Sequence, residues 1–93
     1  MFVRVVRFTD VTAERVESLV ARIDETGPPP GVSIAKLQLI FDEAQGTAVV
    51  LQYFDSEESL RAGAATFAAM DVSETPGIRA SVDTGELKVE REL

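Results

Sequence analysis

Two stretches in the middle of the chain, residues 34–41 and 47–54, are rich in apolar residues with polar ones interspersed, and five polar or small residues separate them. Two such runs, joined by a short segment that ends in glycine, are typical of a β-hairpin. We expect Phe41 to lie opposite Thr47, which sets Lys36 opposite Gln52. One face of this hairpin is then wholly apolar, and the other is mixed but still hydrophobic. The mixed face carries Ile34, Lys36, Gln38, Ile40, Val50, Gln52 and Phe54.

Two further segments have the spacing of amphipathic helices. The first begins after the N-cap Thr12 and ends at Gly27, which three prolines follow. Its apolar stripe consists of Val16, Leu19, Val20 and Ile23. The second is capped by Asp55 or Ser56, with Glu58 placed to close a capping box on Asp55. Its stripe consists of Leu60, Ala64, Phe67 and Ala68.

The remaining strands are expected at the two ends of the chain, over residues 2–8 and from Ile78 onward. The apolar parity of the last strand changes after Gly85, which predicts a bulge or bend at that residue. The order strand, helix, strand, strand, helix, strand predicts one ferredoxin-like α+β domain over residues 1–93, with both helices on one face of an antiparallel sheet. Because the helices cover only one of two apolar faces, we expect the other face to be covered in a two-fold homodimer.

Composition limits the classes of partner and the location. The 93 residues are 45% hydrophobic, enough for a core, and carry a formal net charge of −7. This charge repels phosphate backbones and anionic membrane surfaces, so we expect neither a nucleic acid nor a membrane as partner. The N-terminal residues lack the apolar segment and cleavage site of a signal peptide, and no stretch approaches the roughly 18 apolar residues of a membrane span. A cytoplasmic location is the default expectation.

The absence of histidine and cysteine removes most catalytic chemistry. Nucleophilic Ser–His or Cys–His catalysis is excluded, and acid–base work would fall to a carboxylate. The acidic pairs in the hairpin turn and at the start of the second helix are explained by turn formation and capping. The six glycines are scattered, so no phosphate-binding loop is present. We therefore expect no metal and no cofactor.

Polar residues inside the expected strands are the candidates for a binding site. Lys36, Gln38, Gln52 and Phe54 share one face in the expected register, and a few polar groups on an apolar surface are typical of a pocket that orients a ligand. The full candidate set is Arg4, Lys36, Gln38, Gln52, Phe54 and Phe67, and Arg79 is a further polar residue on the last strand. The alternative is that these residues lie at a sheet edge or in the dimer interface, with their polar ends in water.

The segment Phe54-Asp-Ser-Glu-Glu-Ser-Leu-Arg-Ala62 comes directly after a strand. It resembles the Trp-x-Ser-x-Glu-Ala-Leu-x-Ala segment of the dimeric α/β-barrel superfamily, which includes antibiotic-biosynthesis monooxygenase-like and haem-degrading proteins. The resemblance implies a homodimer whose two sheets form a barrel. It also implies a ligand cavity in each subunit between sheet and helices, on the side of Phe54.

The chain departs from that pattern at informative positions. Phe54 stands where the motif has tryptophan, and Gly63 and Ala64 stand where haem-degrading relatives have the axial histidine. With no histidine, cysteine or tryptophan in the chain, haem ligation of the family's kind is excluded. Two functions remain open. One is the binding of a small hydrophobic metabolite, with a cofactor-independent monooxygenase-like activity as its catalytic form, and the other is a non-catalytic dimerisation or protein-interaction module.

Overall fold

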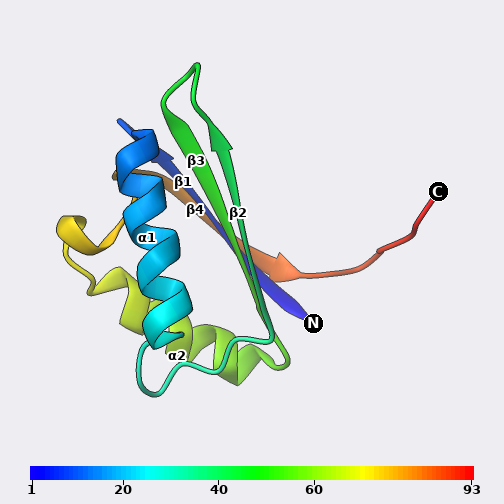
Figure 1. The fold of residues 1–93 in the computed structure, drawn as a ribbon. Coiled ribbons are helices and arrows are strands. Elements are labelled where there is room, and N and C mark those ends of the chain that lie inside the picture. The colour runs from blue at the N-terminus through cyan, green and yellow to red at the C-terminus, as the bar shows by residue number, and fades with distance from the viewer.

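The strands and helices follow the predicted order. The computed structural model describes residues 1–93, apart from the side chain of Val72. The elements are β1 (Phe2–Thr9), α1 (Ala13–Thr26), β2 (Lys36–Asp42), β3 (Thr47–Phe54), α2 (Glu57–Ala68), the short 3₁₀ helix η1 (Val72–Glu74) and β4 (Ile78–Glu86) (Figure 1). The α+β class and the ferredoxin-like βαββαβ arrangement are therefore confirmed.

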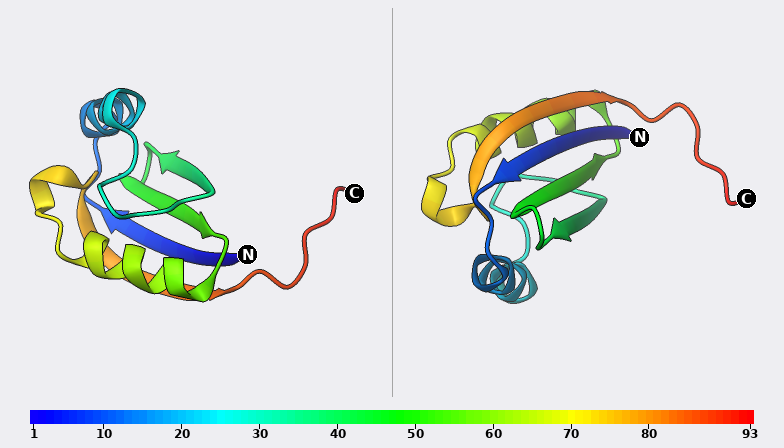
Figure 2. Two further views of the ribbon diagram at one scale, coloured as in Figure 1. Left: turned by 90° about the horizontal axis from the view of Figure 1, so that it is seen from below. Right: turned by 90° about the horizontal axis from the view of Figure 1, so that it is seen from above.

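The four strands form one antiparallel sheet in the order β2-β3-β1-β4. Each helix connects two strands that have a strand of the other half between them, so the fold consists of two interleaved split βαβ units. Both helices lie on the same face of the sheet, and the opposite face is left open (Figure 1). Figure 2 shows the last residues, 87–93, leading away from the sheet.

The ends of α1 match the local sequence signals. The side chain of Thr12 accepts a hydrogen bond from the backbone N–H of Arg15 at 3.2 Å, as an N-cap does. At the other end Gly27 adopts a φ of 67° and donates its N–H to the carbonyl oxygen of Ile23 at 2.9 Å. Glycine takes this left-handed conformation without a steric penalty. The predicted start and stop of the first helix are confirmed.

Helix α2 begins one residue later than the predicted capping box requires. Its N-cap is Ser56, whose hydroxyl accepts a hydrogen bond from the N–H of Ser59 at 3.1 Å. In a capping box the acidic residue lies three positions after the cap. Because the cap is Ser56 and that position holds Ser59, the predicted box between Asp55 and Glu58 is wrong.

The register of the hairpin differs from the prediction by one residue. Phe41 pairs with Ala48, and Asp42 pairs with Thr47. Asp42 joins the strand because its carboxylate accepts hydrogen bonds from the backbone and side chain of Gln45, at 3.1 and 2.7 Å, and so closes a four-residue turn. A shift of one residue moves every side chain of β2 to the other face. Leu37, Leu39 and Phe41 consequently share the helix side with Ala48, Val50 and Gln52.

The irregularity of the last strand also lies elsewhere than predicted. Arg7 pairs with Ser81 and Phe8 with Arg79, so Ala80 is the extra residue of a bulge against β1. The predicted bulge at Gly85 is wrong, since Gly85 pairs regularly with Val3. The bulge instead lies near the start of the strand, where the chain leaves the tight turn that contains Gly77.

The buried core lies between the sheet and the helices and consists of two clusters. The first contains Val6, Phe8, Val11, Ala48 and Val50. The second contains Val32, Phe54 and Leu60. Phe54 is fully buried, and its ring lies where a Cβ at Gly63 of α2 would be, 2.6 Å from the nearest ring carbon. The absence of a side chain at Gly63 thus lets α2 approach the sheet closely, whereas α1 has no fully buried residue.

Candidate functional site

A buried polar pair lies at the centre of the helix side of the sheet. Arg4 of β1 and Gln52 of β3 are direct partners across the two central strands. The guanidinium Nη1 of Arg4 donates a hydrogen bond to Oε1 of Gln52 at 2.9 Å. The exposed fractions of the two residues are only 3% and 4%. A charged side chain buried to this extent is unusual and requires a compensating interaction.

The pair separates the two apolar clusters. Along β1 the helix side carries Phe2, Arg4, Val6 and Phe8, and along β3 it carries Phe54, Gln52, Val50 and Ala48. Arg4 is the one polar residue in this set on β1, and Gln52 is the one polar residue in the set on β3. Antiparallel pairing places these two residues side by side. The Arg4–Gln52 pair, which we call the polar rung, therefore has an apolar cluster on each side of it.

A cavity of about 700 Å³ opens above this rung, between α1 and the sheet. We call it the helix–sheet cavity. Its floor includes Arg4 and Gln52, and its walls come from α1, the Pro28–Pro30 connector, β2, α2 and the turn before β4. The walls include Leu19 and Ile23 of α1, Leu39 of β2, Phe67 of α2, and Met70 just after that helix. The volume falls within the range of about 300–1,000 Å³ found for small-molecule sites.

The charge of Arg4 is not balanced by a carboxylate. No acidic side chain forms an ion pair with it, and its Nε–H has no hydrogen-bond acceptor, among the residues that the structure describes. The carbon at the centre of the guanidinium lies 5.5 Å from the centroid of the Phe67 ring, a cation–π contact. Burial lowers the pKa of Arg4, and repulsion from the positive charge of Arg79 lowers it further. An arginine nevertheless stays protonated in a folded protein.

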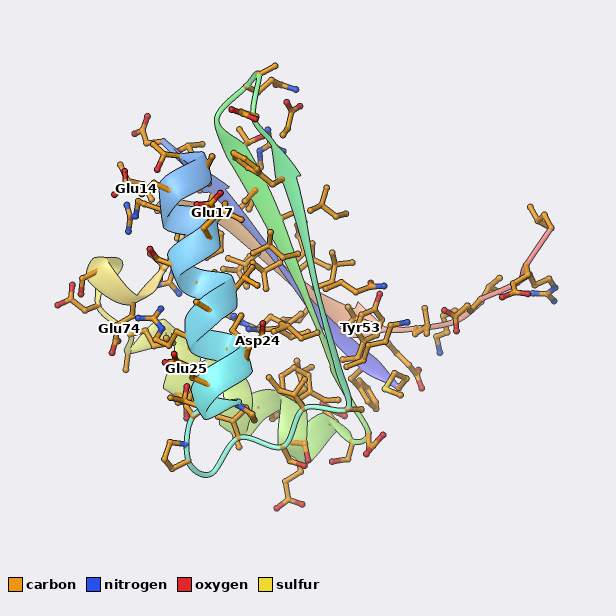
Figure 3. The ribbon with its side chains drawn as sticks, viewed as in Figure 1. Glu14, Glu17, Asp24, Glu25, Tyr53 and Glu74 are labelled. Carbon is orange, nitrogen blue, oxygen red and sulfur yellow. The ribbon has the colours of Figure 1, made fainter. Side chains whose placement is uncertain are left out.

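Other charges around the cavity are also mainly positive. Arg22 and Arg79 line it with Arg4, and the acidic residue among the lining side chains is Glu74. Arg22 donates to the backbone carbonyl of Glu74, and Arg79 donates a long hydrogen bond of 3.4 Å to that of Ala68. The acidic residues labelled on α1 in Figure 3, namely Glu14, Glu17, Asp24 and Glu25, are exposed. A chain with a net charge of −7 thus has a cavity with a local excess of positive charge.

Four of the six residues proposed from the sequence line the cavity: Arg4, Lys36, Gln52 and Phe67. Phe54 lies on the expected side of the sheet, but it is packed under α2 and is not among the lining residues that the structure describes.

Lys36 and Gln38 belong to the other face of the sheet, so the predicted cluster of Lys36, Gln38, Gln52 and Phe54 is wrong. Gln38 accepts a hydrogen bond from the Tyr53 hydroxyl at 2.8 Å, and the Lys36 ammonium lies 4.9 Å from the Tyr53 ring centroid. Figure 3 shows Tyr53 on the side of the sheet away from α1. Lys36 nevertheless contributes to the lining of the helix–sheet cavity, at the start of β2. The hairpin register is the cause of this correction.

Sequence reasoning did not identify the contribution of α1 to the site. The apolar pattern places Leu19 and Ile23 in the stripe that packs on the sheet, and Arg22 on the polar side of the helix. Within the described part of the chain no helix is long and apolar enough to cross a membrane. The described side chains also contain no group of three His, Cys, Asp or Glu residues that could hold a metal ion.

No protein-family model matches the chain. No curated protein matches it either.

Proposed function

We propose that the protein binds a small, mainly apolar metabolite in the helix–sheet cavity. The observation that carries this proposal is the buried Arg4–Gln52 pair on the cavity floor. A charged side chain inside a fold requires compensating partners, and the described residues supply Arg4 with one neutral amide and one aromatic ring. An apolar cavity with a few convergent polar groups is the usual form of a small-molecule site.

The chemistry of the lining favours binding over catalysis. The chain has no histidine or cysteine, and the acidic residue that lines the cavity, Glu74, accepts a hydrogen bond from the N–H of Asp71 at 3.2 Å. That carboxylate therefore has a structural partner already. A cofactor-independent oxygenase in this cavity would depend on a substrate that is itself easily oxidised. Oxygen uptake in the presence of a polycyclic phenol would test for this oxygenase activity.

A matched pair of substitutions on α1 tests the binding proposal. Ile23 lines the cavity, whereas Val20 on the same helix is 43% exposed and is absent from the lining. The neutral fluorescent probe 1-aminoanthracene should bind to the unmodified protein. Ile23→Trp should weaken this binding by about tenfold or more, because the indole occupies the cavity, while Val20→Trp should leave it unchanged. Absence of probe binding to the unmodified protein, or equal binding by both variants, refutes the proposal.

The alternative function, a dimerisation module, is supported by a different surface. The open face of the sheet carries a band of apolar side chains: Val3, Val5, Ile40, Val49 and Leu51. Ile40 is 59% exposed. Polar groups at one end of the band, Lys36, Gln38 and Tyr53, correspond to the polar rim of an interface. We propose that two copies pair through this open face, as the resemblance to the dimeric α/β-barrel superfamily implies.

Sedimentation equilibrium tests the proposed homodimer. Leu51→Glu adds a charge at the centre of the open face, whereas Val89→Glu adds the same charge in the exposed C-terminal segment. The first variant should be monomeric and the second dimeric, because burying an unpaired carboxylate in an interface is costly. A monomeric unmodified protein refutes the homodimer but leaves the binding proposal in place.

A further inference from the structure

The unbalanced charge of Arg4 specifies the ligand more closely than a cavity alone does. The guanidinium has five N–H donors. One is used by Gln52, and the Nε–H has no acceptor among the described residues. In an environment of low dielectric constant, a hydrogen bond between an ionised donor and an ionised acceptor is stronger than one between neutral groups. The partner that this group lacks is therefore an anion.

The neighbouring charges also favour a negatively charged ligand. Arg22 and Arg79 add positive charge at the cavity wall, and both direct N–H donors to backbone carbonyl groups rather than to carboxylates. The repulsion between Arg79 and Arg4 is relieved when an anion enters between sheet and helices. Most of the acidic residues that give the chain its negative charge are exposed, among them Glu14, Glu17, Asp24 and Glu25 of α1, which are labelled in Figure 3.

We infer that the ligand is an apolar, ring-containing acid whose single anionic oxygen group, a carboxylate or an ionised phenol or enol, is bound by Arg4. The apolar body of such a ligand contacts Leu19, Ile23 and Phe67, and its acidic group lies over the polar rung. A doubly charged phosphate fits this cavity less well, because one buried arginine faces it and much of the remaining lining is apolar. The inference rests on the proposed function, because it names the class of ligand for the same cavity.

Gln52 gives the sharpest test of this inference. Gln52→Glu has nearly the same shape and places a carboxylate 2.9 Å from the Arg4 guanidinium, which neutralises it from within the protein. Gln38→Glu is the matched control. It introduces the same change on the same sheet, but on the open face, where the Gln38 oxygen already accepts from Tyr53.

Calorimetric titration with 2-naphthoate and 2-naphthamide compares an acid with a neutral molecule of the same shape. The unmodified protein should bind the naphthoate at least about tenfold more tightly, as expected for one charge-assisted hydrogen bond. Gln52→Glu should abolish this preference, while Gln38→Glu should retain it. Arg4→Met, which replaces the charge by an apolar chain, should also abolish the preference, and it serves as the second variant if Gln52→Glu does not fold.

The possible outcomes separate the inference from the proposed function. Equal binding of acid and amide to the unmodified protein overturns the inference and supports the cavity as a neutral binding site. An equal loss of preference in Gln38→Glu and Gln52→Glu also overturns it, since the effect is then one of net charge. If neither compound binds, both the inference and the proposed function are refuted.

Discussion

Among the six glycines, Gly77, where the chain enters β4, leaves the least room for a side chain. A Cβ added at Gly77 would lie 2.3 Å from the carbonyl oxygen of Thr9 and 2.8 Å from Cγ2 of Val11. Thr9 pairs with Ile78, so its carbonyl cannot retreat without disturbing the junction of β1 and β4. We expect Gly77→Ala to lower the free energy of unfolding by about 2–3 kcal/mol, the upper part of the range for overpacking. In a domain of this size that corresponds to a fall in Tm of about 8–24 °C.

Gly85 on the same strand is the matched control. Nothing lies within 4 Å of a Cβ added there, and neither Gly77 nor Gly85 has a positive φ. Gly85→Ala should therefore leave Tm unchanged or raise it slightly, because alanine restricts the unfolded chain. Thermal unfolding followed by far-ultraviolet circular dichroism measures both variants. If Gly77→Ala melts at the same temperature as Gly85→Ala, the argument from the Thr9 carbonyl is refuted.

Three further variants test other parts of the fold. Phe54→Ala should lower the free energy of unfolding by about 3–5 kcal/mol in urea titrations, since the side chain is fully buried. A loss as small as that of Val89→Ala, a residue that is 66% exposed, would contradict this. Ser56→Ala should cost about 1 kcal/mol through the lost cap of α2, and an unchanged urea midpoint would exclude a role for the cap. Arg61→Ala, which removes an exposed ion pair with Glu57, should change stability by no more than about 0.5 kcal/mol, and this difference should shrink as the salt concentration rises.

Local signals were sufficient to predict the elements from the sequence. The cap at Thr12 and the stop at Gly27 depend only on residues within one helical turn, so they could be located without knowledge of the tertiary structure. The order of strands and helices then restricted the topology to a ferredoxin-like sheet. The register of the hairpin depended on whether Asp42 belongs to the strand or to the turn. That choice is made by its hydrogen bonds to Gln45, which the apolar pattern does not reveal.

The composition of the candidate site could be predicted only in part. Arg4 and Gln52 were both proposed as pocket residues, but their contact joins positions 48 residues apart and depends on the pairing of β1 with β3. The sequence did contain one signal. Every second residue of each of these strands faces the helices, and only one of those residues in each strand is polar. Aligning the two strands antiparallel would have predicted the polar rung. Arg22 could not be predicted in this way, since an arginine on the exposed side of a helical stripe has no such pattern.

The uneven packing of the two helices affects how this architecture can diversify. Helix α2 is fixed against Phe54 at Gly63, whereas α1 has no fully buried residue and forms one wall of the helix–sheet cavity. Substitutions at Leu19 or Ile23 can therefore reshape that wall at little cost to the sheet and α2. Ligand preference and scaffold stability are then encoded by largely separate residues, which allows a lineage to explore new ligands without first acquiring compensating stabilising mutations.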